Sequence, residues 1–223
     1  MIDWERVRAA LLSGKPILIY DFRGREEEVD MVFYAGSIDY RSIYTLRREA
    51  GGLICHAISG EAADRLGLPY LSDLMASVPG ISQLSMRRLR YGDTPPYSLY
   101  INHISVRTGI SDRDRATTIK KFHEVVDLAL SGRVDEARKI FYSEFVSPGH
   151  VPILVSRGLN RRRGHTELSI AVASKLGLVP SMVIAEMLDE GDSMSLEKAE
   201  EYAARMGYII LRGEEILREA GPL

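Results

Sequence analysis

The chain has 223 residues, of which 45% are hydrophobic and 27% are charged, and its formal net charge is −2 at pH 7. No apolar run approaches the roughly 20 residues that a membrane-spanning helix requires, and the small net charge gives no overall attraction to nucleic acid or to an acidic membrane. We therefore expect a soluble globular protein with a small ligand and with no nucleic-acid or membrane partner.

The N-terminus and the cysteine content bear on location. The first residues lack the basic segment followed by an apolar segment that forms a secretion signal. Cys55 is the single cysteine, which excludes an internal disulfide framework. We predict a cytoplasmic protein. At about 150 residues per domain the length falls between one large domain and two small ones, and we expect one domain over residues 1–223.

The first half of the chain predicts helices that alternate with short strands. Asp3 can cap a helix whose apolar residues fall at helical spacing, and Gly14 and Pro16 end it. Prolines and glycines interrupt residues 67–96, which show no sustained period, so we predict mostly loop there. The other elements predicted in this half are strands at 17–20, 31–35, 53–58 and 97–106 and a helix at 41–50.

The second half continues this alternation. A turn at 108–111 leads into a helix, capped by Ser111 or Asp112, that carries Phe122 and other apolar residues on one face. Further predicted elements are helices at 134–142, 161–176, 195–206 and 214–219 and strands at 151–155, 182–188 and 208–211. Strands separated by helices indicate a layered α/β domain.

An acidic stretch from Arg25 to Asp30 carries four carboxylates in six residues, directly after an apolar strand. On charge pattern alone such a stretch is a solvated turn. Its position favours the alternative, because the ends of strands in α/β proteins are where ligand sites collect. The stretch suits a metal ion or a polar substrate.

A second segment, Arg162 to Glu167, is the best local partner for the acidic stretch. The guanidinium of Arg162 can donate two parallel hydrogen bonds to a phosphate. The backbone amides of the residues after it can also bind a phosphate, because they lie at a predicted helix N-terminus. An exposed basic turn is the alternative, and a nucleic-acid patch is disfavoured because aromatic residues for base stacking are absent nearby. His165 with Glu26 could hold a hard cation such as Mg²⁺, which takes few protein ligands.

Two other residues stand out by type. Cys55 fits a buried small hydrophobic residue better than a reactive thiol. Glu186 lies in an otherwise apolar strand, where a carboxylate costs stability unless it is paired, so an acid/base role is reasonable. The sequence has no phosphate-binding glycine motif of the Walker type, no Gly-x-Ser-x-Gly elbow and no paired zinc cysteines.

Taken together, the motifs resemble those of the 3,4-dihydroxy-2-butanone 4-phosphate synthases of riboflavin biosynthesis. The resemblance is collinear from residue 25 to residue 186. It rests on Arg25-Glu26-Glu27-Glu28-Val29-Asp30, Gly52-Leu53-Ile54-Cys55, Leu68-Pro69, Thr108-Gly109-Ile110-Ser111, Asp114-Arg115-Ala116, Thr118-Ile119, Pro148-Gly149-His150, Arg162 with Gly164-His165-Thr166-Glu167, and Glu186.

This resemblance implies a fold and a reaction. The fold is a single-domain layered α/β sandwich with a mixed sheet, working as a homodimer with its sites at the interface. The reaction converts the sugar phosphate ribulose 5-phosphate, with Mg²⁺ (or Mn²⁺), to 3,4-dihydroxy-2-butanone 4-phosphate and formate. The alternatives are another Mg²⁺-dependent sugar-phosphate isomerase or aldolase, and a phosphate-ligand sensor without catalysis.

The resemblance also implies site residues by motif position. Glu26 and His165 are the expected metal ligands. The expected substrate contacts are Arg25, Glu26, Asp30, Thr108, Arg162, Arg163, Gly164, His165, Thr166 and Glu186. The residues expected in catalysis or in the lining of the catalytic pocket are Glu28, Asp30, Cys55, His150 and Glu186.

Three positions depart from the pattern of this family. Glu27 stands where Asn is usual, Val29 where Gly is usual and Asn102 where Asp is usual. The acidic stretch is therefore expected to be more acidic and less flexible than in the family. The segment that carries Arg87, Arg88 and Arg90 is idiosyncratic, and none of these departures removes a residue with an expected chemical role.

Overall fold

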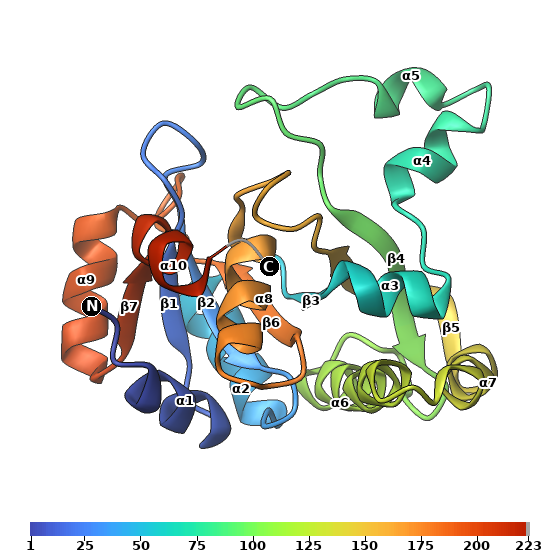
Figure 1. Cartoon of the computed structure of the whole chain (residues 1–223), viewed down its shortest axis with the longest axis horizontal. Coiled ribbons are helices and arrows are strands. Elements are labelled where there is room, and N and C mark those ends of the chain that lie inside the picture. The colour runs from blue at the N-terminus through green and yellow to red at the C-terminus, as the bar shows by residue number, and fades with distance from the viewer. Residues whose placement is uncertain (222–223) are drawn as a thin grey trace.

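The computed structural model describes residues 1–221, which form helices packed on both faces of one sheet (Figure 1). The α-helices are α1 (Trp4–Leu12), α2 (Tyr40–Thr45), α3 (Gly60–Leu66), α4 (Leu71–Ala76), α5 (Ser82–Ser85), α6 (Asp112–Leu130), α7 (Val134–Glu144), α8 (His165–Lys175), α9 (Leu196–Met206) and α10 (Gly213–Ala220), and a π-helix η1 spans Leu46–Ala50. The strands are β1 (Ile17–Tyr20), β2 (Val29–Tyr34), β3 (Cys55–Ile58), β4 (Tyr97–His103), β5 (Phe145–Val155), β6 (Ser181–Glu186) and β7 (Ile209–Arg212).

Within residues 1–221 the seven strands form one mixed sheet in the order β4-β5-β3-β6-β2-β1-β7. The pairs β3–β5 and β1–β7 are parallel, and the other neighbours are antiparallel. Strand β6 therefore joins a half-sheet from the middle of the chain to one built from its two ends. The predicted layered α/β sandwich with a mixed sheet is confirmed.

Alternating side chains of the strands enter two separate cores. In β1, Leu18 belongs to the core that also contains residues of α2, α6 and α9, while Ile17 and Ile19 belong to the core with residues of α1, α8 and α10. The same split occurs in β6, where Val183 and Ile184 enter opposite cores. The near-continuous apolar runs of these strands follow from this burial on both faces.

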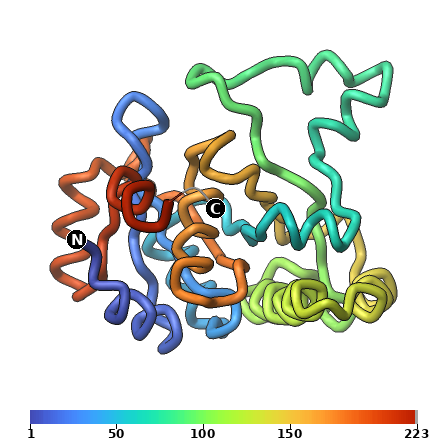
Figure 2. The backbone as a smooth tube through the Cα atoms, viewed as in Figure 1, coloured from blue at the N-terminus to red at the C-terminus, as the bar shows by residue number. Residues whose placement is uncertain are grey.

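The segment at 67–96 is mostly loop, as predicted, but it also contains the two short helices α4 and α5, and α3 before it was not predicted. Helices α4 and α5 belong to a long excursion that leaves the body of the molecule before β4 (Figure 2). No residue of α4 or α5 is buried. A helix without a buried face needs no apolar period, so the pattern that reveals amphipathic helices was absent here.

Some boundaries also differ from the predictions. Strand β2 begins at Val29, inside the acidic stretch, and β5 begins at Phe145 and carries Pro148-Gly149-His150 within it. The predicted helix at 41–50 is split into α2 and η1.

None of the helices in the described part of the chain has the length and apolar character needed to cross a membrane. The single-domain extent stays a prediction, and its last two residues lie outside the described ones.

Candidate active site

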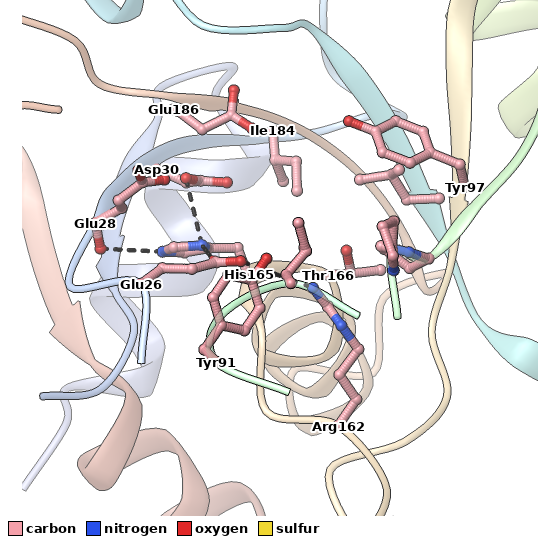
Figure 3. A pocket seen from close by; sticks show the side chains of 14 residues that line it. Glu26, Glu28, Asp30, Tyr91, Tyr97, Arg162, His165, Thr166, Ile184 and Glu186 are labelled. Carbon is pink, nitrogen blue, oxygen red and sulfur yellow. Dashed lines mark hydrogen bonds and ion pairs between the residues drawn. The ribbon is translucent and has the colours of Figure 1, made fainter. Parts of the chain in front are cut away.

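A cavity of about 390 Å³ opens where the acidic stretch, the start of α8 and the end of β6 meet (Figure 3). Most of the polar residues expected from the sequence to form the site lie in its wall. The cavity is lined by Glu26, Glu28, Asp30, Leu89, Tyr91, Pro95, Pro96, Tyr97, Leu154, Arg162, His165, Thr166, Ile184 and Glu186.

The acidic stretch folds around Asp21, a fully buried residue directly after β1. One carboxylate oxygen of Asp21 accepts hydrogen bonds from the Glu26 amide (3.1 Å) and from Arg25 Nη1 (2.9 Å), and the other accepts from the Glu28 amide (3.1 Å). Glu27 has a φ of 59°. Because Asn enters this left-handed region more readily than Glu does, this is the physical cost of Glu27 where Asn is usual.

His165 is the first residue of α8, and its two ring nitrogens have different partners. Nε2 lies 3.1 Å from the carbonyl oxygen of Glu28, which it contacts as a donor. Nδ1 lies 3.4 Å from Glu26 Oε2 and 3.4 Å from Asp30 Oδ1. The ring therefore presents Nδ1 to the two carboxylates, as Figure 3 shows.

The carboxyl groups of Glu26 and Asp30 differ in their environment. Burial would raise the pKa of Glu26, but hydrogen bonds from His165 and Tyr91 and the charge of Arg25 outweigh it and hold that pKa below its usual range. Burial raises the pKa of Asp30 to about 8, against the opposing charge of His165 and with support from Glu186. Glu26 is thus the carboxylate that stays ionised.

His165 has a pKa that is shifted upward. Burial would lower it, but the charges of Asp30 and Glu26 outweigh the burial and raise the pKa of His165 to about 9. The imidazole is therefore held as a cation beside the carboxyl groups of Glu26 and Asp30 at neutral pH. A metal ion beside Nδ1 would replace that proton.

The donor set fits a hard cation with few protein ligands. Glu26 Oε2 and His165 Nδ1 face each other, and Asp30 Oδ1 is buried beside them without a hydrogen-bond partner. Among residues 1–221 no group of three or more His, Cys, Asp or Glu residues has the arrangement of a metal site. Mg²⁺ commonly takes one or two protein ligands and completes its shell with water and substrate oxygens.

The guanidinium groups of Arg25 and Arg162 both lie next to the carboxylate of Glu26, and Arg162 is the more deeply buried of the two. Arg162 is 7% exposed, and its Nη1 donates to Glu167 Oε2 at 2.6 Å. Glu167 is almost fully buried and also accepts from the backbone amides of Gly164 (3.2 Å) and Arg157 (3.0 Å). It thereby fixes Arg162 and the entry into α8, whose first amides and positive dipole end favour an anion.

Glu186 ends β6 directly opposite Asp30 of β2. Its Oε2 accepts a hydrogen bond from the Leu53 amide at 2.9 Å, and its side chain is half-buried in the cavity wall. Gly52 packs so closely on Glu186 that a Cβ at that position would meet its carboxylate and backbone. The carboxylate of Glu186 thus has a hydrogen-bond donor at the end of an apolar strand, and its acid/base role stays a prediction.

Cys55 and Arg163 stand apart from the cavity wall. The Cys55 thiol is buried in β3, and burial raises its pKa, so it stays protonated. Arg163 is exposed, although Arg162 beside it lines the cavity. Their expected roles in the pocket and in substrate binding stay predictions.

Thr108 and His150 lie in a second cluster. Thr108 follows β4, His150 lies in β5, and both are exposed. Asn102 holds this cluster together: its Oδ1 accepts from the His150 amide (2.8 Å), its Nδ2 lies 3.0 Å from His150 Nδ1, and it reaches the Thr108 carbonyl. Neither Thr108 nor His150 lines the cavity. Within one chain the expected site residues therefore form two separate groups.

Three polar residues of the site, Asp21, Tyr91 and Asp93, were not foreseen from the sequence. Asp21 supports the acidic stretch, and Tyr91 and Asp93 contact Glu26 and Arg25 from the excursion before β4. Glu167, which holds Arg162, lay in the predicted segment 162–167 but had no role assigned. A carboxylate directly after a strand was a usable signal for Asp21. The segment with Tyr91 and Asp93 has no period and no motif, so the sequence held no signal for these two residues.

Comparison with known proteins gives one consistent result. The family model for 3,4-dihydroxy-2-butanone 4-phosphate synthase matches residues 5–219. The synthase of that name from Methanosarcina mazei is 40% identical over 223 residues, which cover 95% of this chain and 88% of the relative. The one from Archaeoglobus fulgidus is 38% identical over 227 residues, which cover 97% and 93%.

Solved structures agree on the fold. A 3,4-dihydroxy-2-butanone 4-phosphate synthase in complex with two magnesium ions matches this chain with a TM-score of 0.74 at 24% identity, and the match covers 100% of both chains. At that identity the likeness concerns the architecture. The mixed sheet and its two helical layers are those of this known structure.

Proposed function

Because the chain belongs to the 3,4-dihydroxy-2-butanone 4-phosphate synthase family and is thus an enzyme of riboflavin biosynthesis, we propose that it converts ribulose 5-phosphate to 3,4-dihydroxy-2-butanone 4-phosphate and formate with the help of Mg²⁺ or Mn²⁺. The observation that carries this proposal is the meeting of Glu26, Asp30, His165 and Glu186 beside the buried Arg162 in one cavity. We also propose the cytoplasm as its location, as expected from the sequence.

The phosphate of the substrate is bound by the side of the cavity that carries Arg162. A guanidinium offers two parallel donors to a phosphate, and the N-terminus of α8 adds backbone amides and a favourable dipole. Glu167 keeps Arg162 in place through its 2.6 Å contact. The sugar carbons then extend toward the carboxylates at the ends of β2 and β6.

Glu26 and His165 are the residues that would hold the divalent cation. Bound there, the cation would supply a positive charge beside the oxygens on which negative charge develops. His165 Nε2 donates a hydrogen bond to the Glu28 carbonyl, and this contact orients the ring so that Nδ1 faces Glu26. Glu26 stays ionised under its hydrogen bonds from His165 and Tyr91.

The reaction requires several proton transfers, which the remaining carboxyl groups are placed to make. Removal of a proton beside the ketone gives an enediol, and the loss of water, the skeletal migration, the addition of water and the release of formate each move further protons. Asp30 and Glu186 face each other across the β2–β6 ladder, and Glu28 lines the same wall. A placed acid or base contributes typically about 10²- to 10⁴-fold to each transfer.

We propose that a second copy of the chain supplies the other group, Thr108 and His150. Both residues are exposed and held by Asn102 on a separate face. A homodimer with two-fold symmetry brings the same patch of each subunit to the other, which would complete two sites at once. The cavity of one chain would then receive its last acid/base group from the partner.

The experiment that tests this function incubates the purified protein with ribulose 5-phosphate and Mg²⁺. Proton NMR should show formate and the four-carbon phosphate appearing in equal amounts. The variant Glu186→Gln, which keeps the shape of the side chain, should lose the reaction. A different sugar phosphate appearing without formate would favour an isomerase and would refute the proposal.

A further inference from the structure

The guanidinium groups of Arg25 and Arg162 lie side by side at the edge of the cavity, and both are largely buried. Their side chains are 11% and 7% exposed. A Cβ at Gly164 would touch both groups, which shows how closely they approach one point. Two like charges held together away from water repel each other strongly unless anions accompany them.

Four carboxylates accompany this pair, and three of them have other bonds. Asp21 and Glu167 also bind backbone amides, and Glu26 also binds His165 and Tyr91. Asp93 differs. Its Oδ2 accepts from Arg25 Nη2 (2.7 Å) and Nε (3.2 Å) and lies 3.6 Å from Arg162 Nε. Among residues 1–221 the Asp93 side chain has no partners other than these two arginines.

The Nε of Arg162 is the second sign of an anion position. It is buried, it lacks a hydrogen-bond partner within the described chain, and it faces Asp93 across 3.6 Å. A buried donor left in this state costs free energy, which an acceptor at hydrogen-bond distance would recover. Asp93 therefore occupies the position between the two arginines but leaves Arg162 Nε without a hydrogen bond.

Asp93 also belongs to a part of the molecule that can give way. It lies between α5 and β4, in the excursion that also carries α4 (Figures 1 and 2). No residue of α4 or α5 is buried. A segment with few buried contacts opens at low free energy compared with the core. The Asp93 carboxylate, 24% exposed, can thus leave the arginines without disturbing the sheet.

We propose that Asp93 is a specificity-determining residue of the substrate site, whose carboxylate occupies the anion position between Arg25 and Arg162 until the phosphate of a phosphorylated sugar displaces it. This inference rests on the proposed function. A phosphate dianion offers three oxygens and twice the charge of Asp93, so it can also satisfy Arg162 Nε. A sugar acid offers only another carboxylate and gains nothing over the internal one. Asp93 thereby selects sugar phosphates against sugar acids.

Calorimetric titration of the full-length protein with inorganic phosphate tests this proposal. Asp93→Asn removes the competing charge and keeps the size of the side chain, so it should bind phosphate at least tenfold more tightly than the unaltered protein. Asp73→Asn is the matched control, because Asp73 is an exposed carboxylate in α4 of the same excursion. It should leave phosphate affinity within twofold.

A titration with acetate gives the selectivity directly. Acetate should bind to Asp93→Asn and not to the unaltered protein, because the vacated position accepts any small anion. Asp93→Ala should behave as Asp93→Asn does, and a circular dichroism melt shows that each variant is folded. Phosphate affinity that is unchanged or weaker in both Asp93 variants would overturn the proposal and assign Asp93 to holding the arginines in place.

These readouts do not depend on turnover. If the unaltered protein made no formate from ribulose 5-phosphate, the proposed function would fail while the competition between Asp93 and phosphate could still be measured. If turnover were normal and the phosphate affinities did not change, the function would stand and this inference alone would fall.

Discussion

His165 contacts Glu26 through Nδ1 and the Glu28 backbone through Nε2, so a single ring joins the acidic stretch to the start of α8. The two contacts can be removed separately. Because an Asn amide lies near the position of Nδ1 and a Gln amide near that of Nε2, the two substitutions divide the roles of the ring.

His165→Gln should keep the contact with the Glu28 carbonyl and lose cation binding and turnover. His165→Asn should keep a ligand atom near Glu26 and bind the cation roughly 10- to 100-fold more weakly, which is the usual cost of losing a ligand's outer support. Titration with Mn²⁺ followed by electron paramagnetic resonance measures both. Equal affinities in the two variants and the unaltered protein would remove His165 from the metal site.

Arg162→Lys should raise KM for ribulose 5-phosphate by roughly 10- to 100-fold, as expected from losing one or two charge-assisted hydrogen bonds. A lysine cannot reproduce the fork that contacts Glu167 and a phosphate together. Arg161→Gln, at the exposed neighbouring position, is the control and should leave KM unchanged. Steady-state kinetics decides, and a change in kcat alone would argue against phosphate binding by Arg162.

Mixing two inactive variants should restore activity if the site is shared between subunits. In a random mixture of His150→Ala and His165→Ala chains half of the dimers are mixed, and two-fold symmetry gives each mixed dimer one intact site, so about a quarter of normal activity is expected. Light scattering should give twice the 25.0 kDa mass of one chain. Activity that stays at the level of the separate variants would place both residues in the same subunit's site.

Asp21→Asn should loosen the acidic stretch before it affects the rest of the molecule. The fully buried carboxylate accepts bonds from two backbone amides and from Arg25, and its loss as an anion should cost about 1–3 kcal/mol of folding free energy. Hydrogen exchange of residues 22–28 should become faster, while exchange in β3 and β6 stays slow. Uniform acceleration over the whole chain would indicate general destabilisation instead.

The buried His56 should make the protein sensitive to acid. It lies in β3 with Nε2 2.7 Å from Ser181 Oγ, and burial lowers its pKa to about 3. In the unfolded chain its pKa is about 6.5. As the pH falls below 6.5, His56 becomes protonated in the unfolded chain but stays neutral in the folded protein. The folding stability that is present at neutral pH is therefore lost progressively toward pH 3.

His56→Gln removes this titration and keeps a polar group near Ser181. Between pH 7 and pH 5 the unfolding free energy of the unaltered protein should fall by about 2 kcal/mol more than that of the variant. Urea denaturation at the two pH values measures the difference. Parallel losses in the two proteins would show that His56 is not the responsible group.

The sequence allowed the layered fold and the central group of the site to be predicted, because both depend on local patterns. The continuous apolar runs predicted strands that are buried on both faces, and the acidic stretch after β1 indicated the position of a ligand site. Tyr91 and Asp93 could not be foreseen, since only the tertiary path of an irregular segment brings them to Arg25. The separation of His150 from His165 also depends on the sheet order, which short motifs do not encode.

The position of β6 in that order has a consequence for how the protein is made. Strands β4, β5 and β3 reach β2, β1 and β7 only through β6, which is synthesised after every other strand of the sheet except β7. A nascent chain that has not yet exposed residues 181–186 holds two half-sheets with open edges and no common strand. Because unpaired edges invite association with other chains, the ribosome-bound intermediate is the form most in need of a chaperone. The cavity, whose wall includes Glu186, cannot be completed before β6 has been made.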